Sequence, residues 1–126
     1  MEKMNLYAAW IGILMGTIAG AIQGMFFHEE KWLGGYSSWR RRMIRLGHIS
    51  FFGIGFINFT FAITVSNMNI RTSIFLPSVL FVIGAITMPI ICYLSAYKKF
   101  FRNLFFIPVF SILVGIILFI FGGLFK

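Results

Sequence analysis

Residues 74–96 read IFLPSVLFVIGAITMPIICYLSA, a stretch that contains no Asp, Glu, Lys or Arg. A helix needs about 20 consecutive apolar residues to cross the ~30 Å hydrocarbon core of a bilayer. A charged side chain at the centre of such a helix costs about 2.5–3.5 kcal/mol on the insertion scale, so the absence of charge is informative. The stretch therefore predicts a transmembrane helix.

Three further stretches share this length and this lack of internal charge, and they cover residues 6–27, 46–65 and 104–124. Transmembrane β-strands would be about ten residues long and would alternate in polarity, which these stretches do not do. The short connections between them make successive helices antiparallel neighbours. We therefore predict an all-α integral membrane four-helix bundle with up-down topology, in which residues 1–126 form a single transmembrane domain.

The composition is that of a chain that faces lipid. Of the 126 residues, 60% are hydrophobic and only 11% are charged, whereas soluble domains carry about 25% charged residues. The net charge of +8 comes largely from short basic runs beside the apolar stretches. This placement favours anionic lipid headgroups, and not nucleic acid, as the partner of the positive charge.

The basic residues are distributed unequally between the two sides of the predicted bundle. One side holds Lys31, Arg40, Arg41, Arg42, Arg45, Lys98, Lys99 and Arg102, and the other holds Lys3, Arg71 and Lys126. Lys and Arg are enriched in cytoplasmic loops. We therefore expect the richer side to face the cytoplasm. Both termini would then lie on the non-cytoplasmic side of the cytoplasmic (inner) membrane.

The connection between the first two stretches is the longest, and it contains a predicted helix start. Ser38 is a suitable N-cap, so the second helix is expected to extend into the cytoplasm from about residue 39. Aromatic and basic residues gather here and again after the third stretch. We interpret them as a collar that anchors the chain among lipid headgroups, with docking of a partner subunit or an acidic lipid as the alternative. The collar residues are Trp32, Trp39, Arg40, Arg41, Arg42, Arg45, Lys98, Lys99 and Arg102.

The first stretch carries the most regular pattern in the sequence, a ridge of small residues that recur every four positions on one face of a helix. Small residues let another helix backbone approach closely, which is the basis of GxxxG contacts in lipid. We expect this ridge to pack against the second helix, the fourth helix or another chain. The ridge consists of Ala8, Gly12, Gly16, Gly20 and Gly24, and a shorter version in the fourth stretch contains Ser111 and Gly115.

Few polar residues lie within or beside the apolar stretches, and a polar group without a partner is costly in lipid. Gln23, His28, His48, Asn58 and Thr87 are the candidates for contacts with a ligand or a partner. Asn58 lies near the predicted middle of the bilayer. We expect it to bridge two helices by hydrogen bonding, which is worth about 0.6 kcal/mol on average in membrane proteins.

Pro89 lies within the third stretch, where proline removes one backbone donor and leaves the carbonyl of Ala85 without its usual partner. A kink is expected near this point. The hydroxyl of Thr87 is expected to satisfy part of the freed backbone.

His48 lies just inside the predicted cytoplasmic end of the second helix, at a depth close to those of Gln23 and His28, so the three side chains are expected to converge. We interpret His48 first as a residue that hydrogen-bonds a neighbour or contacts the headgroups. The alternatives are proton transfer and ligation of haem or a chlorin-type pigment. Gly55, on nearly the same helix face, would then leave room for the macrocycle. No other cofactor or metal is predicted.

The sequence has no carboxylate inside the apolar stretches, no phosphate-binding loop and no nucleophile–base pair, so we do not expect an enzyme. We expect an accessory or structural subunit of a larger membrane complex, with electron-transport complexes, respiratory or photosynthetic, as the first hosts to consider. The first alternative is a homo-oligomeric transporter or channel with a polar path through Asn58, Thr60, Thr64 and Thr87. The second is a haem-binding membrane electron carrier that uses His48.

Overall fold

The computed structural model describes residues 2–125, and every regular element in this range is helical. Four helical segments are long and apolar enough to cross a membrane. They are α1 (Glu2–Gly24), α2 (Trp39–Asn67), α3 (Phe75–Tyr97) and a fourth segment, Lys99–Leu124, which contains η2 (Lys99–Leu104), α4 (Phe106–Phe119) and η3 (Ile120–Leu124). The predictions of an all-α chain and of four apolar helical segments are confirmed.

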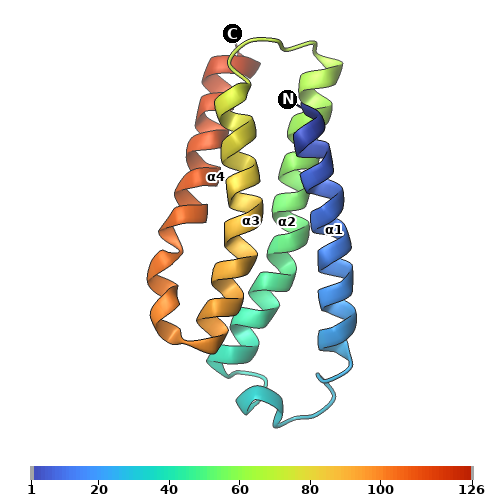
Figure 1. Cartoon of the computed structure of the whole chain (residues 1–126), viewed down its shortest axis with the longest axis vertical. Helices are drawn as coiled ribbons and strands as arrows, with labels where there is room; N and C mark the ends of the chain where they lie inside the picture. The colour runs from blue at the N-terminus through green and yellow to red at the C-terminus, as the bar shows by residue number, and fades with distance from the viewer. Residues whose placement is uncertain (1, 126) are drawn as a thin grey trace.

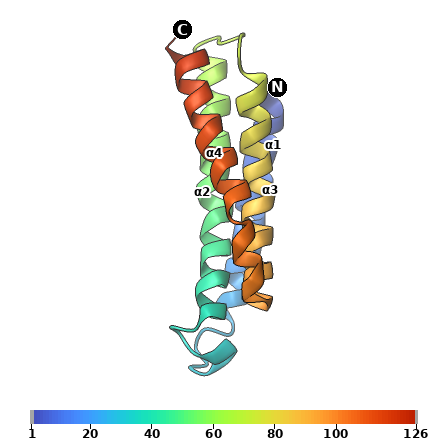
Figure 2. The same ribbon diagram turned by 90° about the vertical axis from the view of Figure 1, so that its left-hand side faces the viewer.

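The four segments lie along the long axis of the molecule, and successive segments run in opposite directions (Figure 1). The start of α1 and the end of η3 lie at one end of the bundle. The long connection between α1 and α2, which contains η1 (Trp32–Gly34), lies at the other end. The helices α2 and α3 pack against each other in the middle, α1 packs mainly on α2, and α4 packs on α3. The view from the side shows how the segments overlap in depth (Figure 2).

The observed helix ends lie close to the predicted ones except at α1 and at the fourth segment, which begins with η2 at Lys99 instead of residue 104. The other correction concerns α1, at both of its ends. This helix begins at Glu2 instead of residue 6, and the chain at residues 25–27 forms turns instead of a last helical turn. The early start has a physical reason, because Asn5 is buried inside the bundle. Its polarity made it look like a residue outside the membrane.

The turn that leads from η1 into α2 is fixed by a capping residue and two glycines. The Ser38 hydroxyl accepts a hydrogen bond from the backbone N–H of Arg41 at 3.2 Å and donates to the carbonyl of Leu33 at 2.8 Å. Gly34 and Gly35 have φ angles of 91° and 100°, which glycine adopts without steric cost. Ser38 is therefore the N-cap of α2.

The third helix continues as an α-helix through Pro89, which is buried. The Thr87 hydroxyl donates to the carbonyl of Ile83 at 2.7 Å and not to the Ala85 carbonyl that the proline leaves free. The expectation for Thr87 is therefore wrong. The reason is that a threonine hydroxyl in a helix reaches the carbonyl four residues before its own position.

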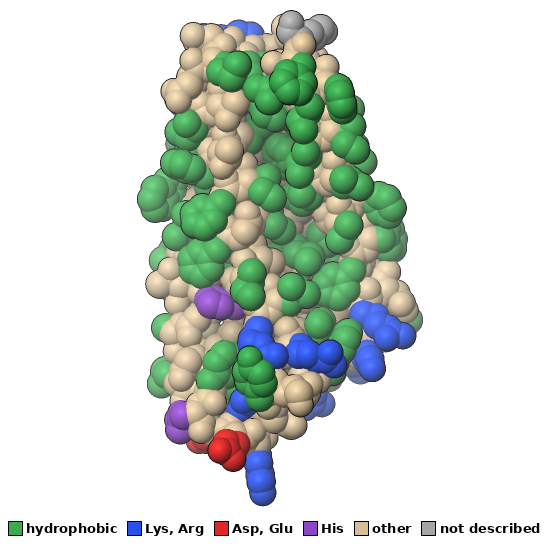
Figure 3. All heavy atoms as spheres, turned by 180° about the vertical axis from the view of Figure 1, so that it is seen from behind, with side chains coloured by type: hydrophobic (Ala, Val, Ile, Leu, Met, Phe, Trp, Pro, Cys, Tyr) green, Lys and Arg blue, Asp and Glu red, His purple; other side chains and the backbone are tan. Residues whose placement is uncertain are grey.

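An apolar core lies between α2, α3 and α4, toward the end of the bundle at which α1 begins and η3 ends. Phe61, Val65 and Phe81 are each only 3% exposed. The Phe61 ring meets the rings of Phe81 and Phe119 edge-on, with centroid distances of 5.2 and 4.9 Å. Such pairs contribute about 0.5–1.5 kcal/mol beyond the burial of their area. Most other large apolar side chains lie on the outer surface, which they cover over much of its length (Figure 3).

Candidate functional site

The small-residue ridge of α1 is directed at α2. A Cβ atom added at Gly16 would lie 2.8 Å from the Phe52 ring, and one added at Gly20 would lie 2.6 Å from Nε2 of His48. At Gly12 the added atom would lie 3.1 Å from a backbone oxygen of α2. These distances leave little or no room for a side chain. The three glycines therefore set how closely α1 approaches α2.

The two ends of the ridge lie outside this contact. Gly24 has open space where a Cβ would stand, and Ala8 lines a groove between α1 and α3. In the fourth segment the Ser111 hydroxyl donates to the carbonyl of Leu80 at 2.5 Å, and Gly115 faces an aromatic ring of α3. The shorter ridge therefore packs on α3.

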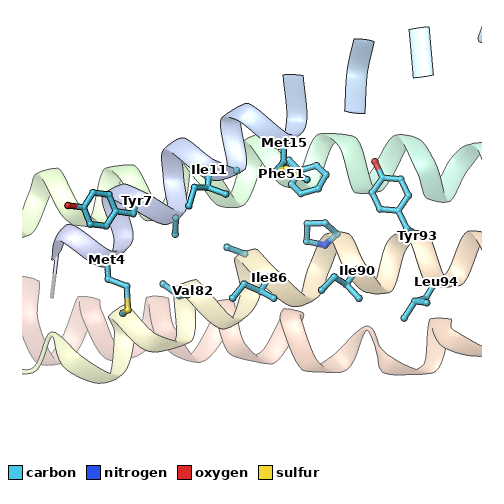
Figure 4. Close-up of a pocket in the computed structure, with 15 residues that line it drawn as sticks. Met4, Tyr7, Ile11, Met15, Phe51, Val82, Ile86, Ile90, Tyr93 and Leu94 are labelled. Carbon is cyan, nitrogen blue, oxygen red and sulfur yellow. The ribbon is translucent and has the colours of Figure 1, made fainter. Parts of the chain in front are cut away.

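An apolar groove of about 780 Å³ lies between α1 and α3, which both pack on α2 (Figure 4). The larger lining side chains come mainly from α1 and α3, and Ile11, Met15, Ile86 and Ile90 are among them. The small residues that line it are Ala8, Gly12, Gly55 and Ala85. Gly12 and Gly55 face the α1–α2 contact, so a further backbone can approach closely only beside Ala8 and Ala85.

Three fully buried polar side chains join α1, α2 and α3. Asn5 donates from Nδ2 to Oδ1 of Asn58 at 2.7 Å and to the carbonyl of Ser78 at 3.2 Å. The Ser78 hydroxyl donates to Oδ1 of Asn5. Nδ2 of Asn58 donates to the carbonyls of Ile54 and Phe81 at 3.0 and 3.2 Å. Asn58 therefore connects three helices, and its polar atoms are already occupied by the protein.

Sequence reasoning missed two members of this cluster. Asn5 fell outside the predicted first span, and Ser78 was not among the candidate polar residues. The sequence contained one signal that Asn5 belongs to the packed face of α1. Asn5 precedes Ala9 by four residues, so the two side chains share one face of the helix. Both are 0% exposed. A second signal was that a buried Asn58 requires partners on neighbouring helices.

Gln23 lies near the collar end of α1 and is only 6% exposed. Its Nε2 donates to the hydroxyl of Tyr93 on α3 at 2.8 Å, while its Oε1 is buried without a hydrogen-bond partner among the described residues. Both side chains line a second cavity, of about 450 Å³, which shares Met15, Phe51 and Tyr93 with the α1–α3 groove. An unpaired buried acceptor costs about 1–3 kcal/mol, so Gln23 is a candidate contact for a ligand.

His48 does not converge with Gln23 and His28. Its imidazole packs over Gly20, while Gln23 turns toward Tyr93 on α3. His28 lies in the connection after α1, with its side chain 73% exposed. The expected convergence is therefore wrong. Its physical cause is the helical period, which directs Gly20 of α1 toward α2 and Gln23 toward α3.

The space beside Gly55, which was expected to admit a macrocycle, is filled by α1. A Cβ added at Gly55 would lie 3.4 Å from the backbone oxygen of Ala9 and 3.8 Å from the side chain of Ile13. Among residues 2–125, no group of three or more His, Cys, Asp or Glu side chains is placed to hold a metal ion.

Arg41 departs from its expected place in the collar, because it is turned inward and only 2% exposed. Its Nε donates to the carbonyl of Trp32 at 2.7 Å, and a terminal nitrogen donates to the carbonyl of Glu29. The guanidinium also lies over the rings of Phe27 and Trp32, at 5.5 and 5.4 Å from their centroids. Arg41 therefore faces the connection between α1 and α2, whose backbone carbonyls take its donors, and not lipid headgroups.

Trp39 links α2 to α3 at the collar end of the bundle. Its indole N–H donates to the carbonyl of Ser95 at 2.8 Å. Nζ of Lys99 lies 5.0 Å from the Trp39 ring centroid, and the guanidinium carbon of Arg42 lies 5.7 Å from it. Such cation–π contacts are worth about 0.5–1 kcal/mol at exposed sites.

The other cationic members of the collar are mostly exposed at the same end of the molecule (Figure 3). Arg45 is half-buried, lies 4.2 Å from the ring centroid of Tyr36 and donates to the Tyr36 carbonyl at 2.9 Å. The exposed cations are Arg40, Arg42, Lys98, Lys99 and Arg102. With the exception of Arg41, the collar therefore presents its charge at the surface.

The polar residues of the proposed transport path are not brought together within one chain. Asn58 is buried in the cluster with Asn5, whereas Thr60 and Thr64 line a separate cavity of about 290 Å³ between α2, α3 and α4. The Thr64 hydroxyl donates to the carbonyl of Thr60 at 2.7 Å, and that of Thr87 bonds to its own helix. The four residues of the proposed path therefore do not line one common cavity.

No protein-family model, curated protein or solved structure matches the chain. The groove between α1 and α3, the Gln23 cavity and the collar are therefore the features from which a function can be proposed.

Proposed function

We propose that this protein is a small accessory subunit of a larger membrane complex, and that the groove between α1 and α3 receives a transmembrane helix of a partner subunit. The observation that carries the proposal is the groove itself. It follows α3 from Val82 to Leu94, about 18 Å at 1.5 Å per residue. That length corresponds to more than half of a membrane span.

The lining of the groove favours a helix as its occupant. Ala8 and Ala85 are the small lining residues that the α1–α2 contact leaves available, and another helix backbone can lie closely against them. In lipid, helices associate through close packing because the hydrophobic effect gives no net drive between them. A groove bordered by apolar side chains and lined in part by small residues offers such packing.

The membrane position of the subunit follows from its surface. Large apolar side chains cover the outside of the segments, and most of the exposed cations gather beyond one end of the apolar surface. We place the chain in the cytoplasmic membrane with the collar in the cytoplasm and both termini outside, following the positive-inside rule. The collar would contact anionic headgroups there.

Electron-transport complexes are the first hosts that we propose. The chain has little mass outside its four helical segments, and its apolar stretches contain no carboxylate. These properties suit a subunit that fills space and supports neighbours. The channel and haem alternatives have weaker support, because the polar path is divided and α1 fills the space beside Gly55.

Native gel electrophoresis in mild detergent, at the native expression level, tests the proposal. The protein should co-migrate with a larger partner that has its own transmembrane segments. Ala8→Leu and Ala85→Leu, which add bulk to the groove, should weaken the association by at least tenfold. Ala21→Leu, an exposed site on α1 outside the groove lining, is the matched control and should leave it intact. Migration as a monomer or homodimer alone would reject the accessory-subunit role.

A further inference from the structure

A pocket of about 450 Å³, here called the collar pocket, lies at the collar end of the bundle. One wall comes from η1 and the first residues of α2, and the other comes from the end of α3 and the start of η2. Leu33, Trp39, Ala96 and Tyr97 are among its lining residues. Of the described residues, none lines both this pocket and the α1–α3 groove or the Gln23 cavity. The collar pocket is therefore a separate feature of the molecule.

Each wall of the collar pocket carries one cation whose hydrogen-bond donors are unused. Arg40 of α2 is exposed and has no hydrogen-bond or ion-pair partner among residues 2–125. Nζ of Lys99 in η2 lies 5.0 Å from the ring centroid of Trp39, the residue next to Arg40. The ammonium group has three N–H donors, and no oxygen atom of the described residues accepts from them. The two walls therefore present a guanidinium and an ammonium to the same pocket.

No carboxylate balances the positive charge of the collar pocket among the described residues that line it. The two acidic residues at this end of the molecule are Glu29 and Glu30, which lie in the connection after α1. The Glu29 carboxylate lies 4.0 Å from Nε2 of His28. Because α2 begins here and α3 ends here, the positive end of one helix dipole is offset by the negative end of the other. The two cationic side chains therefore decide the sign of the pocket, which suits an anion.

The position of the collar pocket favours a lipid phosphate as the anion. Arginine binds phosphate oxygens through pairs of N–H groups, and lysine binds them as a point charge. Tyr97 lines the pocket at the end of α3 and is 72% exposed, as is typical of aromatic residues at a membrane surface. Most of the cations lie directly below the apolar surface of the helices (Figure 3). A phosphate held there places the acyl chains of a lipid against that surface.

From these features we infer that the collar pocket binds the phosphate of one anionic glycerophospholipid between Arg40 and Lys99. The inference rests on the proposed membrane placement of the collar, and it adds one discrete, saturable site to the general attraction between the collar and anionic headgroups. It does not require a host complex. A chain that binds no lipid in this pocket would therefore leave the accessory-subunit proposal standing, and a chain without a host complex would leave the lipid site standing.

Native mass spectrometry of the purified full-length protein, released from detergent micelles, tests the inference. The protein is titrated with phosphatidylglycerol and with phosphatidylcholine that carries the same acyl chains. One phosphatidylglycerol should bind about tenfold more tightly than phosphatidylcholine and than any further phosphatidylglycerol. Equal binding of the two lipids would overturn the inference. Excess sn-glycerol 3-phosphate should leave the bound lipid in place, and its displacement would show that a soluble phosphate compound is the ligand instead.

A pair of double variants with equal charge locates the site on the chain. Arg40→Gln with Lys99→Gln should reduce phosphatidylglycerol affinity by about tenfold and leave phosphatidylcholine affinity nearly unchanged. Lys31→Gln with Arg102→Gln is the matched control, because it removes two exposed cations from the same end of the molecule but outside the pocket lining. Equal losses in the two double variants would contradict a discrete site. If the first variant does not fold, the comparison of the two lipids on the unmodified protein decides alone.

Discussion

The side-chain amide of Asn5 donates to the side-chain oxygen of Asn58 at 2.7 Å, between two fully buried residues that lie 53 positions apart in the sequence. Ser78 of α3 completes the cluster, so three helices share one polar contact. Because a polar group without a partner is costly in an apolar surrounding, the contact specifies how α1, α2 and α3 fit together. The cluster therefore holds α1 and α3, which form the two walls of the groove, against α2.

Replacing Asn58 by Leu should destabilise the protein by about 1–3 kcal/mol, because Asn5 loses an acceptor while it stays buried. Unfolding by SDS in mixed micelles, followed by circular dichroism, measures the change. Thr17→Val should change stability by less than about 0.5 kcal/mol, since its hydroxyl is exposed and bonds only to its own helix. Equal stability of the two variants would show that the polar cluster does not hold the helices together.

Replacing Gly16 by Ala should also destabilise the protein, by about 1–3 kcal/mol, because overpacking forces α1 away from α2. The new methyl group would lie 2.8 Å from the Phe52 ring and 3.1 Å from Cβ of Phe51, and this Cβ moves only with the backbone. The same unfolding titration measures the effect.

Gly53→Ala serves as the control for that substitution. Gly53 lies within α2 and has no atom within 4 Å of an added Cβ. Alanine is favoured over glycine in a helix by about 0.8–1.0 kcal/mol, so this variant should be as stable as the original or more stable. A loss of stability at Gly53 equal to that at Gly16 would remove the distinction between a packed and an open glycine.

Arg41→Gln should loosen the connection between α1 and α2, because the carbonyls of Glu29 and Trp32 lose their guanidinium donor. Hydrogen–deuterium exchange of residues 25–38 should become at least tenfold faster. Arg42→Gln is the matched control, since Arg42 is exposed and adjacent in the sequence. If both variants exchange alike, Arg41 does not order this connection.

The number and type of the helices were predictable from the sequence, because crossing lipid requires long uncharged stretches. The start of α1 was not, since hydropathy treats Asn5 as a surface residue and its partners lie on two other helices. Burial of a polar residue depends on tertiary contacts that only the fold reveals.

The roles of single collar residues could not be predicted from the sequence either. Arg40, Arg41 and Arg42 are identical in chemistry and consecutive in sequence, yet only Arg41 is buried. The helical period separates their directions, and the path of the preceding loop decides which one meets backbone carbonyls. The small-residue ridge of α1 predicted close helix packing. Its partner could not be predicted, because whether the ridge faces α2 or another chain depends on how the helices are arranged.

Photo-crosslinking in cells at native expression levels tests the groove as a docking site most directly. A photoreactive amino acid replaces Ile86 in the groove, or Leu113 on the exposed face of α4 as the control. We expect position 86 to form a crosslink to a transmembrane segment of one larger membrane protein, and position 113 to form none. Crosslinks from position 86 only to lipid or to a second copy of the chain would contradict this expectation.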